Sequence, residues 1–193
     1  MFDLLRAHIR KRVALTDEEF DRCSSYFTQK KIRKRQFLLQ EGEICRDIAF
    51  VTAGCLRAYT IDHKGNEHVI QFAVPDWWIS DLASYLDGSP ATQTIDALQD
   101  SEVLLLDRSV RDELLNAVPV LERFFRLLLE ANYIATHRRI QDSLSASAEE
   151  RYLTFLKTYP DLAGQIPQAH IASYLGITPQ SLSRIRRELA RGR

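Results

Sequence analysis

The 193-residue chain has few cysteines, no long apolar run and no net charge, and each shortage excludes a class of protein. Its three cysteines, Cys23, Cys45 and Cys55, form no C-x-x-C pair. Such a sparse and odd set is typical of a reducing compartment rather than a disulfide framework. It is also one thiolate short of the usual four-cysteine iron–sulfur site. No uncharged apolar run approaches the roughly 18 residues of a membrane span, so we expect no membrane contact.

The N-terminal segment lacks the features of a secretory signal. Asp3 and the basic residues from Arg6 onward interrupt the stretch that would have to be apolar, and no small-residue cleavage site follows. With 45% hydrophobic and 27% charged residues, the chain has enough apolar side chains for a core, which excludes wholesale disorder. We therefore expect a cytoplasmic protein with one large domain, or with a medium domain and a small second one.

The zero net charge hides an uneven distribution. Residues 1–35 carry ten basic and five acidic side chains, residues 36–135 carry seven and sixteen, and residues 136–193 carry nine and five. Residues 181–193 alone contain five arginines and one glutamate. A basic end beside an acidic body indicates a segment that meets a polyanion, although solvated faces of ordinary helices are an alternative explanation.

The sequence pattern of the first half of the chain predicts a β-domain. Thr16 followed by Glu19 predicts a capping box that starts a helix running to about Phe27. From residue 36 to residue 107, short segments rich in Val, Ile, Phe, Leu and Thr alternate with turn-forming residues. These turns lie at Gly42, Gly54, 64–66 and 87–90. Six or more short strands at this spacing predict an antiparallel sandwich, roll or barrel.

Beyond residue 107 the pattern is helical. A short helix over 108–118 precedes a longer one from Pro119 to about Leu144, which would span about 38 Å. The apolar residues of its first half cover more than one face, so the helix must be buried on two sides. One side can face the β-domain and the other the same helix of a second subunit; burial within one monomer is the alternative. The residues expected at this dimer helix are Leu121, Phe124, Phe125, Leu128 and Ala131.

Residues 168–187 have the pattern of a helix-turn-helix. Ile171 and Leu175 give the first helix an inward face, and Gly176 supplies the positive φ that the tight turn needs. Thr178 can cap the second helix, and Pro179 occupies its first position, where no backbone donor is lost. A helical hairpin used only for packing is the alternative, but the exposed basic face favours DNA binding.

The second helix is predicted to read DNA. Leu182, Ile185 and Leu189 bury one face and turn polar and basic residues outward. Arginine can grip guanine in the major groove, and glutamine can grip adenine. Other arginines, including Arg193, are placed for phosphates, which supply affinity rather than sequence choice. The expected DNA-binding residues are Thr178, Gln180, Ser181, Ser183, Arg184, Arg186, Arg187 and Arg191.

The chain resembles the Crp/Fnr superfamily of transcription regulators over essentially its whole length, because a β-roll is followed by a long helix and then by this motif. The resemblance implies an α+β fold: a cyclic-nucleotide-binding-like antiparallel β-roll (jelly roll) with an N-terminal helix over 1–117, a central dimerisation helix over 118–144, and a helix-turn-helix domain over 145–193 without an evident C-terminal wing. It further implies a homodimer that binds double-stranded DNA at a roughly two-fold symmetric operator, with RNA polymerase as a candidate further partner.

The chain departs from the resemblance at the effector site. Family members that bind cyclic AMP carry a phosphate-binding cassette that runs from Gly-Glu-Leu to Arg-Ser. Here Ser80, Asp81 and Leu82 occupy the first part and Ala91 and Thr92 the second. Nothing near Ala91 supplies a cation, and a buried phosphate without a partner charge is costly. We therefore expect a small-molecule effector other than cyclic AMP, or a pocket that is packed shut.

Two other functions remain as alternatives. A cupin-like metal-binding enzyme would use His63, Glu67 and His68, which cluster in one hairpin, but these residues fall on its turn rather than on inward strand positions. An effector-sensing interaction module would use the C-terminal motif to recruit a protein, and such a helix usually shows an exposed apolar stripe. We therefore expect a regulator that is not an enzyme, with no metal and no certain cofactor.

Overall fold

In the computed structural model of the chain, residues 1–191 are described, and Arg193 lies outside them. The strands are β1 (Phe27–Ile32), β2 (Phe37–Leu39), β3 (Asp47–Ala53), β4 (Leu56–Ile61), β5 (Glu67–Ala73), β6 (Trp78–Ile79), β7 (Thr94–Ala97) and β8 (Ser101–Asp107). The helices are α1 (Phe2–Arg10), α2 (Asp17–Ser24), α3 (Leu82–Asp87), α4 (Arg108–Ala117), α5 (Val120–Ser145), α6 (Ala148–Thr158), the 3-10 turn η1 (Leu162–Gly164), α7 (Gln168–Leu175) and α8 (Pro179–Arg191). None of these helices is long and apolar enough to cross a membrane.

The chain divides into two compact units. The first contains Met1–Thr60 and Ile70–Glu130, and the second contains Ile61–Val69 with the chain from Ala131 onward. The tip of the hairpin between β4 and β5 therefore belongs to the helical second unit. The expected division into 1–117, 118–144 and 145–193 is a functional one and stays a prediction.

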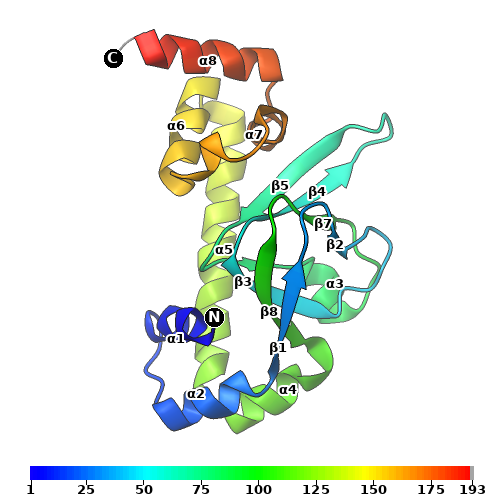
Figure 1. Cartoon of the computed structure of the whole chain (residues 1–193), viewed down its shortest axis with the longest axis vertical. Coiled ribbons are helices and arrows are strands. Elements are labelled where there is room, and N and C mark those ends of the chain that lie inside the picture. The colour runs from blue at the N-terminus through cyan, green and yellow to red at the C-terminus, as the bar shows by residue number, and fades with distance from the viewer. Residues whose placement is uncertain (192–193) are drawn as a thin grey trace. The chain divides into compact units, whose positions relative to one another are not determined.

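The first unit is the antiparallel β-roll that the sequence predicts. Its two four-stranded sheets have the strand orders β1-β8-β3-β6 and β2-β7-β4-β5 (Figure 1). Strands that follow one another in sequence mostly lie in different sheets, as they do in a roll. Between the sheets lies a core of aliphatic and aromatic side chains, among them the fully buried Phe50, Leu56, Ile95 and Leu104.

A glycine allows the close approach at the turn between β3 and β4. Gly54 has φ +82°, in the left-handed region that only glycine enters freely. A Cβ at this position would collide with the backbone of Asp100 and Ser101. The turn therefore packs directly against the β7–β8 connection, where Ser101 Oγ also accepts a hydrogen bond from the Cys55 N–H (3.1 Å).

The expected capping box is present, but its helix is shorter than predicted. The Glu19 N–H donates to Thr16 Oγ1 and the Thr16 N–H to Glu19 Oε2, at 3.1 and 2.9 Å. Helix α2 ends at Ser24 rather than near Phe27, because Phe27 begins β1 and pairs with Leu106 of β8. Strand β1 is an edge strand that buries only its two end residues, so its sequence has no alternating apolar pattern.

A buried histidine ties the N-terminal helix to the roll. His8 is 4% exposed, and its Nε2 accepts a hydrogen bond from the Trp78 indole N–H at 3.2 Å. Arg12 also places a guanidinium N–H 3.0 Å from Nε2. The ring proton therefore lies on Nδ1, which is 2.7 Å from an Asp76 carboxylate oxygen. Burial lowers the pKa of His8 below 6.5, although the Asp76 carboxylate acts in the opposite direction.

We expect His8 to make the protein less stable as the pH falls. The unfolded chain binds the proton at a pKa near 6.5 and the folded chain only at a lower pKa, so the free energy of unfolding falls once the pH drops through 6.5. His8→Asn, which can still donate to Asp76, should be less stable at pH 7 and should flatten the dependence between about pH 7 and 5. Urea denaturation at several pH values measures both effects.

The titration of Asp76, the carboxylate partner of His8, falls outside the pH range in which His8 is tested. Hydrogen bonds from Lys11 and His8 hold the pKa of Asp76 below 3.8 although burial opposes them, so its contribution to stability is lost only at a more acidic pH. An unchanged slope between pH 7 and 5 in the His8→Asn variant would show that another group causes the loss.

Candidate DNA-binding motif and effector site

Helices α7 and α8 form the helix-turn-helix that residues 168–187 predict. Gly176 ends α7 in the left-handed conformation (φ +65°), and the Ile177 N–H donates to the Ala172 carbonyl at 3.0 Å. A Cβ on Gly176 would meet no atom within 4 Å, so the backbone angle rather than lack of space calls for glycine here. Pro179 is the first residue of α8, as expected.

The inward faces of the motif are built as predicted except at Leu189, which is half-buried. Ile171, Ala172 and Leu175 of α7 are buried, and so are Leu182 and Ile185 of α8. Behind them Phe155 of α6 lies 5.2 Å from Tyr159 and 5.8 Å from Tyr174, measured between ring centroids. Figure 1 shows α6, α7 and α8 grouped around the C-terminal part of α5. The motif therefore has its own small aromatic core.

The eight expected DNA-binding residues differ in their exposure to solvent. Gln180, Arg184, Arg187 and Arg191 are exposed on α8, and Thr178 is exposed just before it. Ser181, Ser183 and Arg186 are half-buried. The exposed arginines recur at intervals of three and four residues, so they share one side of the helix.

Two of the eight residues are engaged within the motif. Thr178 Oγ1 accepts a hydrogen bond from the Ser181 N–H at 3.1 Å and lies 3.0 Å from Ser181 Oγ. Thr178 thus caps α8, as the sequence predicts. Both hydroxyls therefore already have a partner within the motif.

Sequence reasoning missed a contact that Ser173 makes on the outer side of α7. Its hydroxyl donates to the Glu67 carbonyl at 2.7 Å and accepts from the Val69 N–H at 2.9 Å, both within the second unit. The serine therefore bonds to the backbone on one edge of the hairpin tip, much as a neighbouring strand would. Because the two segments lie more than a hundred residues apart in sequence, no local pattern indicates this pairing.

Hydrogen bonds connect the two parts of the cassette. Asp81 is 2% exposed and caps α3 by accepting from the Ser84 N–H at 3.2 Å. Its other oxygen accepts from the Thr92 N–H at 2.8 Å and lies 3.2 Å from Thr92 Oγ1. Ala91 is buried, and its N–H donates to the Glu43 carbonyl at 2.7 Å. Both carboxylate oxygens of Asp81 therefore already accept hydrogen bonds from the two ends of the cassette.

Ser80 and Leu82, the other two cassette residues, are half-buried on either side of Asp81. The neighbouring tryptophans behave as core and rim aromatics. Trp78 is buried with its ring centroid 5.0 Å from that of Phe50, and Trp77 is half-buried. The apolar surroundings of these rings belong to the core of the roll.

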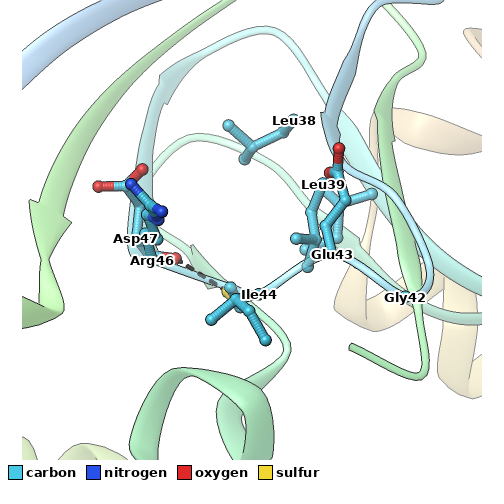
Figure 2. A pocket seen from close by; sticks show the side chains of 9 residues that line it. Leu38, Leu39, Gly42, Glu43, Ile44, Arg46 and Asp47 are labelled. Carbon is cyan, nitrogen blue, oxygen red and sulfur yellow. Dashed lines mark hydrogen bonds between the residues drawn. The ribbon is translucent and has the colours of Figure 1, made fainter. Parts of the chain in front are cut away.

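A pocket of about 540 Å³ opens beside the cassette. Leu38 and Leu39 of β2, Ile95 of β7 and residues 42–47 line it, and Figure 2 shows the labelled side chains around an open centre. Its wall is joined to the cassette through the Cys45 N–H, which donates to Ser84 Oγ at 2.8 Å. Its lining is both apolar and charged, because Leu38, Leu39, Ile44 and Ile95 lie beside the charged groups of Glu43, Arg46 and Asp47.

The cysteines are buried thiols, and one of the hairpin histidines has a carboxylate partner. Burial raises the pKa of Cys23 and of Cys55 to about 12, so both are neutral thiols at physiological pH. His68 pairs with Asp62 at 3.0 Å in the hairpin turn. Among the described residues 1–191, no three His, Cys, Asp or Glu side chains are grouped as metal ligands. Four-cysteine iron–sulfur ligation does not fit three separate buried thiols.

The structure corrects part of the expected dimer surface on α5. Leu121 (1% exposed) and Phe124 (fully buried) pack into the core of the first unit, so they face their own chain. Phe125 and Leu128 are half-buried against the same core, and Ala131 is exposed. The exposed apolar residues of α5 lie further along, at Leu129, Tyr133, Ile134, Ile140 and Leu144.

The known proteins that this chain is similar to include bacterial regulatory proteins. A family model for the cyclic nucleotide-binding domain matches residues 29–117. The fumarate and nitrate reduction regulatory protein of Vibrio cholerae is 24% identical over 185 residues, which is 89% of this chain and 72% of that protein. Regulatory protein HlyX of Actinobacillus pleuropneumoniae is 23% identical, over 89% of this chain and 75% of its own.

Solved structures share the fold. FixK2 from Bradyrhizobium japonicum superposes with a TM-score of 0.72 at 22% identity, over 86% of this chain and 85% of its own. The cyclic-di-GMP-responsive regulator CLP of Xanthomonas campestris gives a TM-score of 0.73 at 10% identity, over 92% and 93%. Both ends of the molecule, the roll and the helical motif, therefore have counterparts of known structure.

Proposed function

Since the chain belongs to the Crp/Fnr superfamily of transcription regulators, which are not enzymes, we propose that it is a sequence-specific DNA-binding regulator acting as a homodimer. The observation that carries the proposal is α8, whose buried Leu182 and Ile185 leave Gln180, Arg184 and Arg187 exposed on a capped recognition helix. The shape and charge of this face suit a major groove.

The side chains of α8 then divide by role. Gln180 and Arg184, near the start of the helix, read base edges, with Ser183 and Arg187 beside them. Arg186 and Arg191 contact phosphates and add affinity without sequence choice. We assign the sensing role to residues 1–117, dimerisation to 118–144 and DNA binding to 145–193.

Selection from a pool of randomised duplexes tests this function directly. We expect enrichment of a two-fold symmetric site whose half-sites lie about one helical turn, roughly 10 bp, apart. Affinity for that site should fall steeply as salt rises, because bound arginines release counterions from the phosphates. Recovery of no preferred sequence, or binding that does not respond to salt, would contradict the proposal and favour a protein-docking module.

The homodimer rests on the exposed apolar face of α5. Leu129, Tyr133 and Ile140 are separated by four and seven residues, as successive d, a and a positions of a coiled-coil seam are, and Leu144 follows at the neighbouring e position. Leu144 is 83% exposed and Tyr133 70% exposed in the single chain. A second copy of the same helix covers such a face most simply, and a change in its pairing would move both recognition helices.

The effector is a small molecule other than a cyclic nucleotide. We expect calorimetric titration with cyclic AMP and cyclic GMP to give flat traces, because the Asp81 carboxylate already accepts three hydrogen bonds and Ala91 offers no cation to the phosphate. Stoichiometric binding with a Kd below about 1 mM, which corresponds to a binding free energy of roughly −4 kcal/mol, would contradict this expectation. It would mean that the cassette opens and that another donor serves the phosphate.

A further inference from the structure

The pocket beside the cassette is separate from the cassette itself. It is lined by residues 38–39, 42–47 and 95, all of which lie in the first unit, and these do not include the five cassette residues. Its volume of about 540 Å³ is within the usual range of ligand pockets, roughly 300–1,000 Å³. The first unit therefore has room for a small molecule that the cassette does not hold.

Hydrogen bonds hold one wall of this pocket in place. The Gly42 N–H donates to the Ala91 carbonyl at 2.8 Å, and the Arg108 N–H donates to the Arg46 carbonyl at 2.8 Å. Segment 42–47 is therefore fixed near both of its ends. Because this wall is formed before any ligand arrives, binding does not have to order it.

Four apolar side chains contribute to the lining. Leu39 and Ile95 are buried and Leu38 is half-buried, whereas Ile44 is 40% exposed. A large apolar side chain that is exposed at a pocket is stabilised when an apolar part of a ligand covers it. We therefore expect a ligand with an apolar part.

The lining also carries the consecutive residues Arg46 and Asp47. Arg46 is exposed and Asp47 half-buried, and within residues 1–191 neither side chain has a hydrogen-bond or ion-pair partner. Burial and the Asp107 carboxylate raise the pKa of Asp47, although Lys30 and Arg46 act in the opposite direction. A half-buried carboxylate without a donor is stabilised by a cation that donates a hydrogen bond to it.

The charges around the pocket disfavour a ligand with charge of one sign only. Figure 2 shows Arg46 and Asp47 on one side of the open centre and Glu43 on the other. An anion would meet two carboxylates, and a cation would meet the Arg46 guanidinium. A zwitterion avoids both conflicts. In an α-amino acid the nitrogen and the carboxylate carbon are only about 2.5 Å apart, so the two charged groups can pair with two consecutive residues.

We propose that this pocket binds an α-amino acid with an apolar side chain. The ammonium group pairs with Asp47 and the carboxylate with Arg46. The apolar side chain lies against Leu38, Ile44 and Ile95. The role of this amino acid as the effector rests on the regulatory function proposed above, whereas its binding to the pocket does not.

Calorimetric titration of the full chain with L-phenylalanine, in the absence of DNA, tests the binding. We expect saturable binding of one molecule per chain. 2-Phenylethylamine lacks the carboxylate and 3-phenylpropionate lacks the ammonium group, so each should bind at least about tenfold more weakly through the loss of one charge-assisted hydrogen bond. Glycine, which has no apolar side chain, should give a flat trace.

The variants Arg46→Gln and Asp47→Asn test whether the amino acid occupies this pocket. Each should bind L-phenylalanine at least about tenfold more weakly than the unmodified chain. Asp47→Asn also removes a repulsion from Asp107, so this variant should fold normally. A matched control, Asp21→Asn/Arg22→Gln, changes two consecutive exposed residues of α2 and should bind like the unmodified chain.

The outcomes separate this proposal from the DNA-binding function. No binding of L-phenylalanine would overturn the proposal, and unchanged binding in both pocket variants would overturn it by placing the amino acid elsewhere. Equal binding of the amine, the acid or glycine would show that one of the three assigned contacts is not made, and would also overturn it. None of these results involves DNA, so the DNA-binding function would stand. Failure to select an operator would instead remove the effector role and leave the binding of the amino acid intact.

Discussion

Replacing Tyr133 and Ile140 by glutamate is expected to convert the protein into a monomer that binds its operator at least about 100-fold more weakly. Both side chains are exposed in the single chain and lie seven residues apart on α5, so they fall on one line along the helix. Two like charges there would face their copies across a dimer axis and would have to be desolvated. The second half-site contact, which is intramolecular in a dimer, would then be lost.

Sedimentation and DNA-binding titrations measure the two consequences separately. Glutamate is a good helix former, so α5 itself should persist. Ala135→Glu/Arg138→Gln changes exposed positions on the opposite side of the same helix and should leave the dimer intact. If the Tyr133/Ile140 variant sediments as a dimer, the exposed face of α5 has a different role.

Arg184→Ala is expected to cost about 1–3 kcal/mol of binding to the preferred operator and to relax sequence choice at one base position of each half-site. Arg184 is exposed in the second turn of α8, and the hydrogen-bonded cap at Thr178 fixes where this helix begins. Its side chain can therefore meet a base edge in a constant register. Binding to operator variants with each base substituted in turn would locate the affected position.

Arg191→Ala provides the contrast. Arg191 is exposed at the end of α8, and its loss should weaken binding to every duplex by a similar factor while lowering the salt slope by about 1. Equal relaxation of sequence choice in both variants would refute this division of roles between the two arginines.

Most of the fold could be predicted because its elements carry local signals. Pro119, Gly176 and Pro179 stand where helices begin or end, and the long helix α5 runs to Ser145, close to the expected Leu144. Strand β1 could not be found in this way, because an edge strand with four exposed residues between Phe27 and Ile32 has no apolar alternation. Only its pairing with β8 makes it a strand.

The candidate site was less predictable where contacts between residues distant in sequence determine which side chains are buried or hydrogen-bonded. The periodicity of α5 shows that two faces are apolar, but it does not tell which face meets the chain's own core, so Leu121 and Phe124 were assigned to the wrong side. The substitution of Ala91 for a cation was visible in the sequence. The engagement of Asp81 by Thr92, eleven residues away, was not, because it depends on how the cassette closes.

The contact between Trp78 and His8 has a spectroscopic consequence. The chain's two tryptophans are adjacent, at positions 77 and 78, so its tryptophan fluorescence arises from one place, where α1, β6 and α5 meet. The Trp78 indole N–H donates to an imidazole nitrogen that a proton would otherwise occupy. Emission from the unlabelled protein therefore reports whether the N-terminal helix is docked, and it allows that docking to be followed during acidification or ligand titration without an added dye.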